Sequence, residues 1–178
     1  MKILTLLRHA KSGWDDPALR DFDRPLNPRG RRAARTVGRA LKAQGLGFDA
    51  VVASAAVRVV ETLRDVGDGY GSAFQPEHEQ ALYLASPAVL LDRIQTVDDR
   101  VERLLLVGHN PGLEQLALLL TPEAPGALRD ALAAKFPTAT VAEISLPVDH
   151  WADVTEGRGT LTRFIRPRDL DPELGPED

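Results

Sequence analysis

The sequence predicts an α/β protein with a parallel central sheet. Three short apolar runs, at residues 3–7, 49–53 and 103–107, have the length and the bounding residues of buried strands. Helix-like stretches follow these runs, and such an alternation is typical of parallel sheets. The chain has 178 residues, of which 43% are apolar and 27% are charged. This composition is ordinary for a single globular domain that buries its own core.

The composition also excludes several classes of chemistry. The chain contains no cysteine, so disulfides, cysteine metal sites and cysteine-dependent phosphatase chemistry are excluded. The first strand begins almost at Met1 without a secretory signal pattern, and no run of about 18 apolar residues predicts a membrane span. We therefore expect a cytoplasmic protein with no membrane partner. The net charge of −4 disfavours non-specific binding to nucleic acid.

A long polar loop separates the first predicted strand from the first predicted helix. This loop covers residues 11–26, and ordered connections of that length tend to be functional. Asn27 and Pro28 then supply an N-cap residue and a proline at the first helical position. We expect the helix to end at Gly45.

The middle of the chain continues the alternation. Ser54 follows the second predicted strand and leads into a helix that carries Arg58. The stretch at 66–72 is rich in glycine, which predicts a turn. A helix over 87–97 is expected next, with Ser86 as its N-cap.

The last third of the chain has a different pattern. A leucine-rich helix is predicted at 113–120, and two strands are predicted at 138–146 and 159–165. The tail at 168–178 contains prolines and acidic residues, so we expect it to be flexible. The predicted organisation is therefore one domain over 1–167 and an acidic C-terminal tail.

Cationic and imidazole side chains gather where the predicted strands end. His9 follows the run at 3–7, His109 follows the run at 103–107, Arg8 precedes His9, and Arg58 lies just beyond the run at 49–53. Arg8 and His9 taken alone are equally consistent with a polar strand cap. If the strands are parallel neighbours, however, all four side chains lie at one edge of the sheet. Two guanidinium groups and two imidazoles suit a tetrahedral dianion and a histidine nucleophile or acid.

The segment Leu7-Arg8-His9-Ala10 resembles the arginine–histidine–glycine signature of the histidine phosphatase superfamily. Ala10 replaces the usual glycine, as it does in small SixA-like members. Further matching segments follow in the family's order, and the resemblance covers the chain from residue 5 to about 166. These segments are Arg24-Pro25-Leu26 with Gly30, Ser54 through Arg58 to Thr62, Val107-Gly108-His109-Asn110-Pro111 and Phe136-Pro137-Thr138-Ala139.

This resemblance implies a three-layer α/β/α sandwich with a mostly parallel central sheet, the phosphoglycerate-mutase-like fold. It implies a metal-independent phosphohydrolase that uses no cofactor. His9 would be the nucleophile that becomes phosphohistidine, Arg8 and Arg58 would hold the phosphoryl oxygens, and His109 would donate to the phosphoryl group. Catalysis of this kind depends on positioning and charge stabilisation.

A nucleophilic His9 must be neutral at its attacking nitrogen, although an unperturbed imidazole has a pKa near 6.5. The neighbouring arginines are expected to disfavour the imidazolium. The other ring nitrogen needs an acceptor that fixes the tautomer, commonly a backbone carbonyl.

Further candidates for the site are weaker. Lys11, Ser12 and Asn110 follow the two histidines and are candidate substrate-binding residues. Glu79 is the candidate proton donor, chosen over Glu77 and Asp92. SixA-like members also lack a clear acid in this interval, which suits a good leaving group such as that of a phosphoramidate. No spacing of histidines or acidic residues predicts a metal site.

The preferred function is therefore that of a SixA-like protein phosphohistidine phosphatase. A phosphatase of a small phosphomonoester or nucleotide is the alternative, because the reaction centre barely distinguishes these substrates. A further alternative, which is not an enzyme, is a phosphate-binding protein with the same fold. The arginines at 29, 31, 32 and 35 suggest nucleic-acid binding, but such a run usually forms a solvated helix face.

Overall fold

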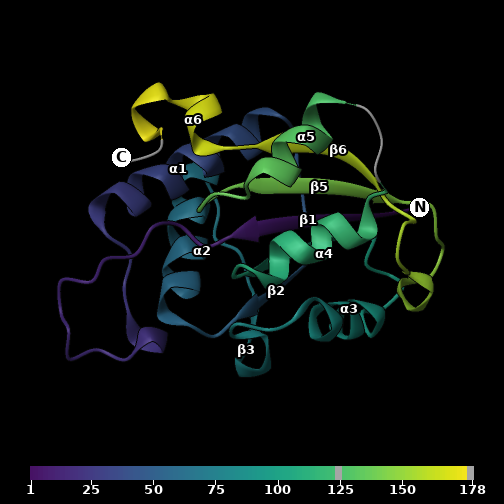
Figure 1. Ribbon diagram of the computed structural model, residues 1–178, viewed down its shortest axis with the longest axis horizontal. Coiled ribbons are helices and arrows are strands. Elements are labelled where there is room, and N and C mark those ends of the chain that lie inside the picture. The colour runs from purple at the N-terminus through teal and green to yellow at the C-terminus, as the bar shows by residue number, and fades with distance from the viewer. Residues whose placement is uncertain (123–125, 176–178) are drawn as a thin grey trace.

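The computed structural model describes residues 1–122 and 126–175 and contains a six-stranded sheet between two layers of helices (Figure 1). The order of the strands in the sheet is β3-β2-β4-β1-β5-β6. In chain order the strands are β1 (Lys2–Arg8), β2 (Ala50–Ser54), β3 (Glu77–Glu79), β4 (Arg103–Gly108), β5 (Val141–Leu146) and β6 (Thr160–Ile165).

The sheet is mostly parallel, as predicted. Strand β4 pairs in parallel with β1 on one side and β2 on the other, and β3 pairs in parallel with β2. Strand β5 is antiparallel to β1 and to β6. The carboxyl ends of β1, β2 and β4 consequently lie at one edge of the sheet, as the prediction for the site requires.

Helices cover both faces of the sheet, which confirms the three-layer architecture. One layer contains α1 (Pro28–Ala43), α2 (Val57–Tyr70) and α6 (Pro167–Leu170), and the other contains α3 (Pro87–Gln95), α4 (Gly112–Leu120) and α5 (Ala127–Ala134). Alternate residues of β4 enter the two resulting cores. Leu104 and Leu106 pack with α3 and α4, whereas Leu105 and Val107 pack with α1 and α2. None of the described helices is long and apolar enough to span a membrane.

Helix α1 begins and ends as predicted. The Asn27 side chain accepts a hydrogen bond from the Gly30 backbone N–H at 2.7 Å, and Pro28 occupies the first turn. The helix ends before Gly45, which has a φ of +70°. Gly30 also lets the helix approach the preceding loop, because a Cβ there would lie 2.1 Å from the Lys11 carbonyl oxygen. The start of α1 is thus fixed beside the segment that follows β1.

The turn predicted at 66–72 is wrong, because α2 continues to Tyr70. The glycines there serve helix packing. A Cβ on Gly69 would lie 2.1 Å from the Arg35 carbonyl oxygen, and a Cβ on Gly38 would lie 2.1 Å from the Val66 carbonyl oxygen. Glycines on both helices therefore permit a close approach of α1 and α2, and the chain turns only at Gly71, which has a φ of +90°.

The described part of the predicted tail, which we expected to be flexible, contains regular structure. Residues 167–170 form α6, and a 3-10 turn at Pro172–Leu174 follows it. Leu174 is buried, and Arg32 of α1 makes salt bridges with Asp171 and Glu173 at 2.6 and 2.7 Å. Asp171 and Glu173 therefore bind the segment to α1. Residues 176–178 of the predicted tail lie outside the described residues.

Several predicted elements are shorter in the structure. The helix expected over 87–97 is α3, which ends at Gln95. The strand expected from residue 138 begins only at Val141, because Ala139 has a φ of +56° and its N–H donates to the carbonyl oxygens of Arg8 and His9. This local departure from strand geometry brings residues 136–138 to the end of β1.

Candidate active site

The ends of β1 and β4 place the two predicted histidines side by side. Arg8 pairs with Gly108 in the parallel register, and the His9 N–H donates to the Gly108 carbonyl oxygen at 3.1 Å. The next residue of each strand is therefore at the same level of the sheet. The rings of His9 and His109 lie 5.2 Å apart between centroids.

Thr62 connects α2 to the residue after His9. Its hydroxyl accepts a hydrogen bond from the Ala10 N–H at 2.9 Å and donates to the Arg58 carbonyl oxygen at 2.6 Å. Because Arg58 lies one helical turn before Thr62, this connection holds Arg58 beside His9. The distance from Arg58 Nε to His9 Nε2 is 3.4 Å.

The His9 ring has its two nitrogens in different roles. Nδ1 lies 2.7 Å from the Ala10 carbonyl oxygen, which can only accept, so Nδ1 carries the proton of the neutral ring. Nε2 is then unprotonated and faces Arg58. Burial lowers the pKa of His9 to about 3 against the opposing hydrogen bond to Ala10, with further lowering from His109, Arg58 and Arg8. Burial is thus a larger cause than the neighbouring arginines.

His109 is also held neutral. Burial and the nearby Arg58 and Arg8 lower the pKa of His109 to about 4, against an opposing effect of Asp21. Its Nε2 lies 2.7 Å from Ser54 Oγ at the end of β2. Its Nδ1 is buried and has no hydrogen-bond partner within the described parts of the chain. A donor or acceptor on a bound molecule would satisfy that nitrogen.

A cavity of about 250 Å³ opens over the two histidines, and we call it the reaction cavity. It brings together seven of the eight site residues predicted from the sequence, with Glu79 as the exception. The residues that line the cavity are Arg8, His9, Lys11, Ser12, Trp14, Arg24, Arg58, Leu84, His109, Asn110 and Thr138.

Arg8 and Asn110 share one hydrogen-bond acceptor. Arg8 Nη1 donates to the Phe136 carbonyl oxygen at 3.0 Å, and Asn110 Nδ2 donates to the same oxygen at 2.9 Å. Phe136 is fully buried and opens the segment that resembled the family at 136–139. Arg8 Nε is buried and has no hydrogen-bond partner among the residues that the structure describes. That N–H group is a donor that an anion in the cavity would satisfy.

The long loop at 11–26 supplies a cation that we did not predict as part of the site. Arg24 lines the reaction cavity and is 7% exposed. Its guanidinium lies over the Trp14 ring at 3.5 Å and donates to Ser12 Oγ at 2.7 Å. The resemblance of Arg24-Pro25-Leu26 to the family could have indicated this residue, but it assigned no role to Arg24.

Asp21 of the same loop is the second residue that the prediction missed. Its backbone oxygen and its carboxylate both accept hydrogen bonds from Arg58, at 2.7 and 3.0 Å. The carboxylate also accepts from Tyr83 and Arg24. Burial raises the pKa of Asp21, but the hydrogen bonds from Tyr83, Arg58 and Arg24 outweigh it and lower the pKa to about 2. Asp21 is therefore a constant negative charge that orients Arg58.

The structure does not bring Glu79 into the reaction cavity. Its carboxylate accepts hydrogen bonds from Arg93 Nε at 2.9 Å, at the sheet edge formed by β3. No carboxylate of the described part of the chain lines the reaction cavity. Within residues 1–122 and 126–175, no three histidine or acidic side chains gather as ligands for a metal ion.

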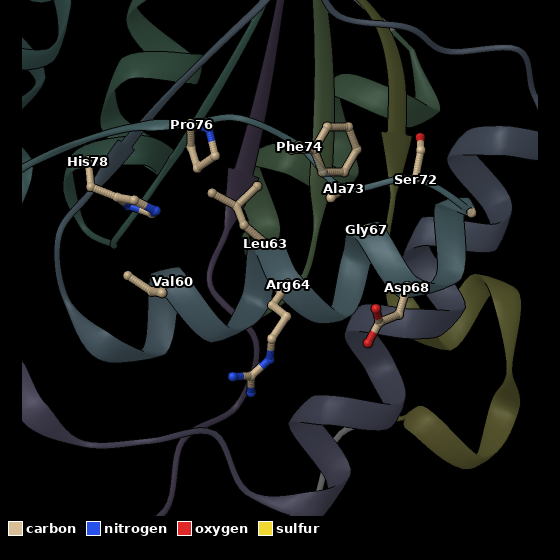
Figure 2. A pocket seen from close by; sticks show the side chains of 11 residues that line it. Val60, Leu63, Arg64, Gly67, Asp68, Ser72, Ala73, Phe74, Pro76 and His78 are labelled. Atoms are coloured by element: carbon tan, nitrogen blue, oxygen red, sulfur yellow. The ribbon is translucent and has the colours of Figure 1, made fainter.

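Another cavity, of about 490 Å³, lies along α2 and the segment from Ser72 to His78 (Figure 2). Leu63 and Phe74 contribute apolar side chains to it. None of the predicted site residues lines this cavity. The predicted site residues other than Glu79 therefore lie at the reaction cavity and not at this one.

The reaction cavity can bind a tetrahedral anion and attack it. Arg8, Arg24 and Arg58 supply positive charge, and guanidinium groups match phosphoryl oxygens in pairs. The unprotonated Nε2 of His9 is the candidate nucleophile of this pocket. Charge that develops on the phosphoryl oxygens is stabilised by cations already in place.

Comparisons with known proteins agree with this geometry. The model of the histidine phosphatase superfamily, branch 1, matches residues 4–83. The uncharacterized protein Rv1276c of Mycobacterium tuberculosis is 37% identical over 164 residues, which cover 91% of this chain and all of the relative. The uncharacterized protein ML1117 of Mycobacterium leprae is 32% identical over 169 residues with the same coverage.

Two solved structures are similar over almost the whole chain. A protein of Nakamurella multipartitia assigned as the phosphohistidine phosphatase SixA has a TM-score of 0.79 and 29% identity, and covers 93% of this chain and 96% of its own. One from Agrobacterium tumefaciens with the same assignment has a TM-score of 0.76 and 28% identity, and covers 93% of this chain and 98% of its own. This chain therefore belongs to the histidine phosphatase superfamily and is a SixA-like phosphatase.

Proposed function

We propose that this phosphatase hydrolyses phosphohistidine on protein substrates through a covalent intermediate on His9. The observation that carries the proposal is the state of His9. Its Nδ1 proton is held by the Ala10 carbonyl oxygen, and its Nε2 faces the guanidinium of Arg58. A neutral imidazole with a defined attacking nitrogen, set among cations, is arranged for transfer of a phosphoryl dianion.

The proposed reaction has two displacements at phosphorus. In the first, His9 Nε2 forms a bond to phosphorus, and the bond from phosphorus to the substrate nitrogen breaks with its electron pair going to that nitrogen. Arg8 and Arg58 hold the phosphoryl oxygens, Lys11, Ser12 and Asn110 complete the pocket, and His109 donates to the group through its ring N–H. In the second, the oxygen of a water molecule forms a bond to phosphorus, and the bond from phosphorus to His9 Nε2 breaks with its electron pair returning to Nε2. The water proton is released to solvent, inorganic phosphate leaves, and neutral His9 is restored.

The choice of a phosphoramidate substrate rests on the reaction cavity having no carboxylic acid among its described lining residues to protonate a leaving group. Asp21 is the nearby carboxylate that holds Arg58, and its hydrogen bonds lower its pKa to about 2 despite the opposing effect of burial. Asp21 is thus ionised at neutral pH and cannot protonate a leaving group. An alkoxide leaving group needs such an acid, whereas the nitrogen of phosphohistidine can be protonated from solvent before the bond breaks.

The test is a substrate series with wild type and His9→Ala. We expect kcat/KM to be highest for a phosphohistidine protein, intermediate for an aryl phosphate and lowest for an alkyl phosphate. His9→Ala should abolish all three activities, and EDTA should leave them unchanged. His150→Ala is the matched control, because His150 is an exposed histidine that pairs with Asp99.

The intermediate can be trapped as well. Wild type incubated with a radiolabelled substrate and quenched in alkaline denaturant should carry label that is stable to base and labile to acid, as a phosphoramidate is. Activity that survives His9→Ala at the wild-type rate refutes the nucleophile. Preference for a small phosphomonoester or nucleotide refutes the protein substrate, and tight binding without turnover supports a non-catalytic phosphate-binding protein.

A further inference from the structure

A second cavity adjoins the reaction cavity and is lined by cations. Its volume is about 350 Å³, and we call it the basic cavity. The two cavities share Arg8, Lys11 and Thr138, so they are neighbouring parts of one concave surface. The cationic residues that line the basic cavity are Arg8, Lys11, Arg29, Lys135, Arg166 and Arg168. Among residues 1–122 and 126–175, no acidic residue lines it.

The basic cavity is built from three parts of the chain that meet near the end of β1. They are the start of α1, the segment from Lys135 to Thr138, and the C-terminal segment that includes α6. Figure 1 shows α6 next to α1 on the side of the molecule toward which β1 points. The C-terminal segment that we expected to be a flexible tail therefore forms one wall of this cavity.

The cationic side chains of the basic cavity differ in the partners that they have within the protein. Arg166 makes a salt bridge with Asp169 at 2.8 Å, and Arg29 donates to the Gly175 carbonyl oxygen. Lys135 and Arg168 are exposed, and neither has a carboxylate within 4.0 Å among the residues that the structure describes. These two charges at the rim are therefore open to a ligand.

This concentration of charge exceeds what one phosphoryl group requires. Arg8, Arg24 and Arg58 already surround the reaction cavity. The chain as a whole has a net charge of −4, so an acidic ligand is repelled elsewhere and attracted here. Pro137, Pro167 and Leu174 add apolar surface to the same cavity, which suits a peptide backbone with acidic side chains.

We propose that the basic cavity binds acidic side chains that flank the phosphohistidine of a protein substrate. That the phosphorylated residue is a histidine rests on the proposed function. The preference for acidic side chains beside that residue rests on the lining of the basic cavity. Lys135 and Arg168 recognise the flanking carboxylates, and Arg8 and Lys11 connect this subsite to the reaction cavity.

The test uses two histidine peptides that are identical except that flanking glutamates in one are glutamines in the other. The unphosphorylated peptides are measured as inhibitors of p-nitrophenyl phosphate hydrolysis, and the phosphorylated peptides as substrates. We expect wild type to bind the glutamate peptide about threefold to tenfold more tightly, as expected for two exposed ion pairs. Added salt should reduce this preference.

The variant is the double substitution Lys135→Gln and Arg168→Gln, and the control is Arg100→Gln, which removes an exposed charge paired with Asp98. The double variant should lose the preference through KM or the inhibition constant, with p-nitrophenyl phosphate hydrolysis unchanged. Equal binding of both peptides by wild type, or a preference that survives in the double variant, overturns the inference. A preference for the glutamate peptide without hydrolysis of either phosphopeptide supports the subsite and refutes the proposed function.

Discussion

The protonation state of His9 leads to a sharp prediction. Burial lowers the pKa of His9 to about 3, helped by its cationic neighbours and opposed by its hydrogen bond to Ala10. At pH 5 the imidazole should therefore be about 99% neutral, whereas an unperturbed histidine with a pKa near 6.5 would be about 3% neutral. The fraction of competent nucleophile thus differs about thirtyfold between the two cases at this pH.

The assay is an NMR titration of the ¹⁵N-labelled imidazoles in a buffer free of phosphate. The His9 signals are assigned by their loss in His9→Gln, and they should show a proton on Nδ1 and none on Nε2 down to pH 5. His150 is the internal control, because its hydrogen bond to Asp99 raises its pKa above the ordinary value. A His9 signal that titrates near pH 6.5, or one with its proton on Nε2, would refute the reasoning.

Three further changes test the packing around the site by urea unfolding. In wild type, the pKa of His9 is lower in the folded than in the unfolded state, so the unfolded chain takes up the proton first as the pH falls below 6.5. His9 should therefore lower the free energy of unfolding by about 2 kcal/mol between pH 7.5 and pH 5, and His9→Gln should remove this part of the pH dependence. Gly38→Ala should cost about 1–3 kcal/mol, since its Cβ would lie 2.1 Å from the Val66 carbonyl oxygen, whereas Gly47→Ala, with open space around it, is the control. Thr62→Val should cost about 1–3 kcal/mol and lower kcat/KM, because the buried Ala10 N–H loses its acceptor, and Thr62→Ser should restore both.

The fold and the centre of the site could be predicted because both depend on local patterns. Apolar runs mark β1, β2 and β4, and parallel pairing then places the residues after those strands at one edge. His9, His109 and Arg58 meet for this reason. The start of α1 at Asn27 was equally readable, because a cap and a proline act within one turn.

The parts that could not be predicted depend on contacts between distant segments. The glycines of α2 suggested a turn, and only the packing of Gly69 against Arg35 shows why a helix tolerates them. The acidic tail suggested flexibility, but Arg32 of α1 pairs with Asp171. Asp21 is one of several acidic residues in its loop, and its role appears only when Arg58 and Tyr83 approach it.

The electrostatics of the reaction cavity give His109 a role that depends on the substrate. In the free protein, burial and the positive charges of Arg58 and Arg8 hold its pKa near 4, so His109 is neutral. A phosphoryl dianion between the histidines would offset those positive charges and favour the imidazolium. His109 would then gain a proton when the phosphoryl group binds and donate it as charge develops on the oxygens. His9, whose Nδ1 proton is held by the Ala10 carbonyl oxygen, would keep Nε2 for attack. In the proposed mechanism, two adjacent histidines would therefore divide the roles of hydrogen-bond donor and nucleophile.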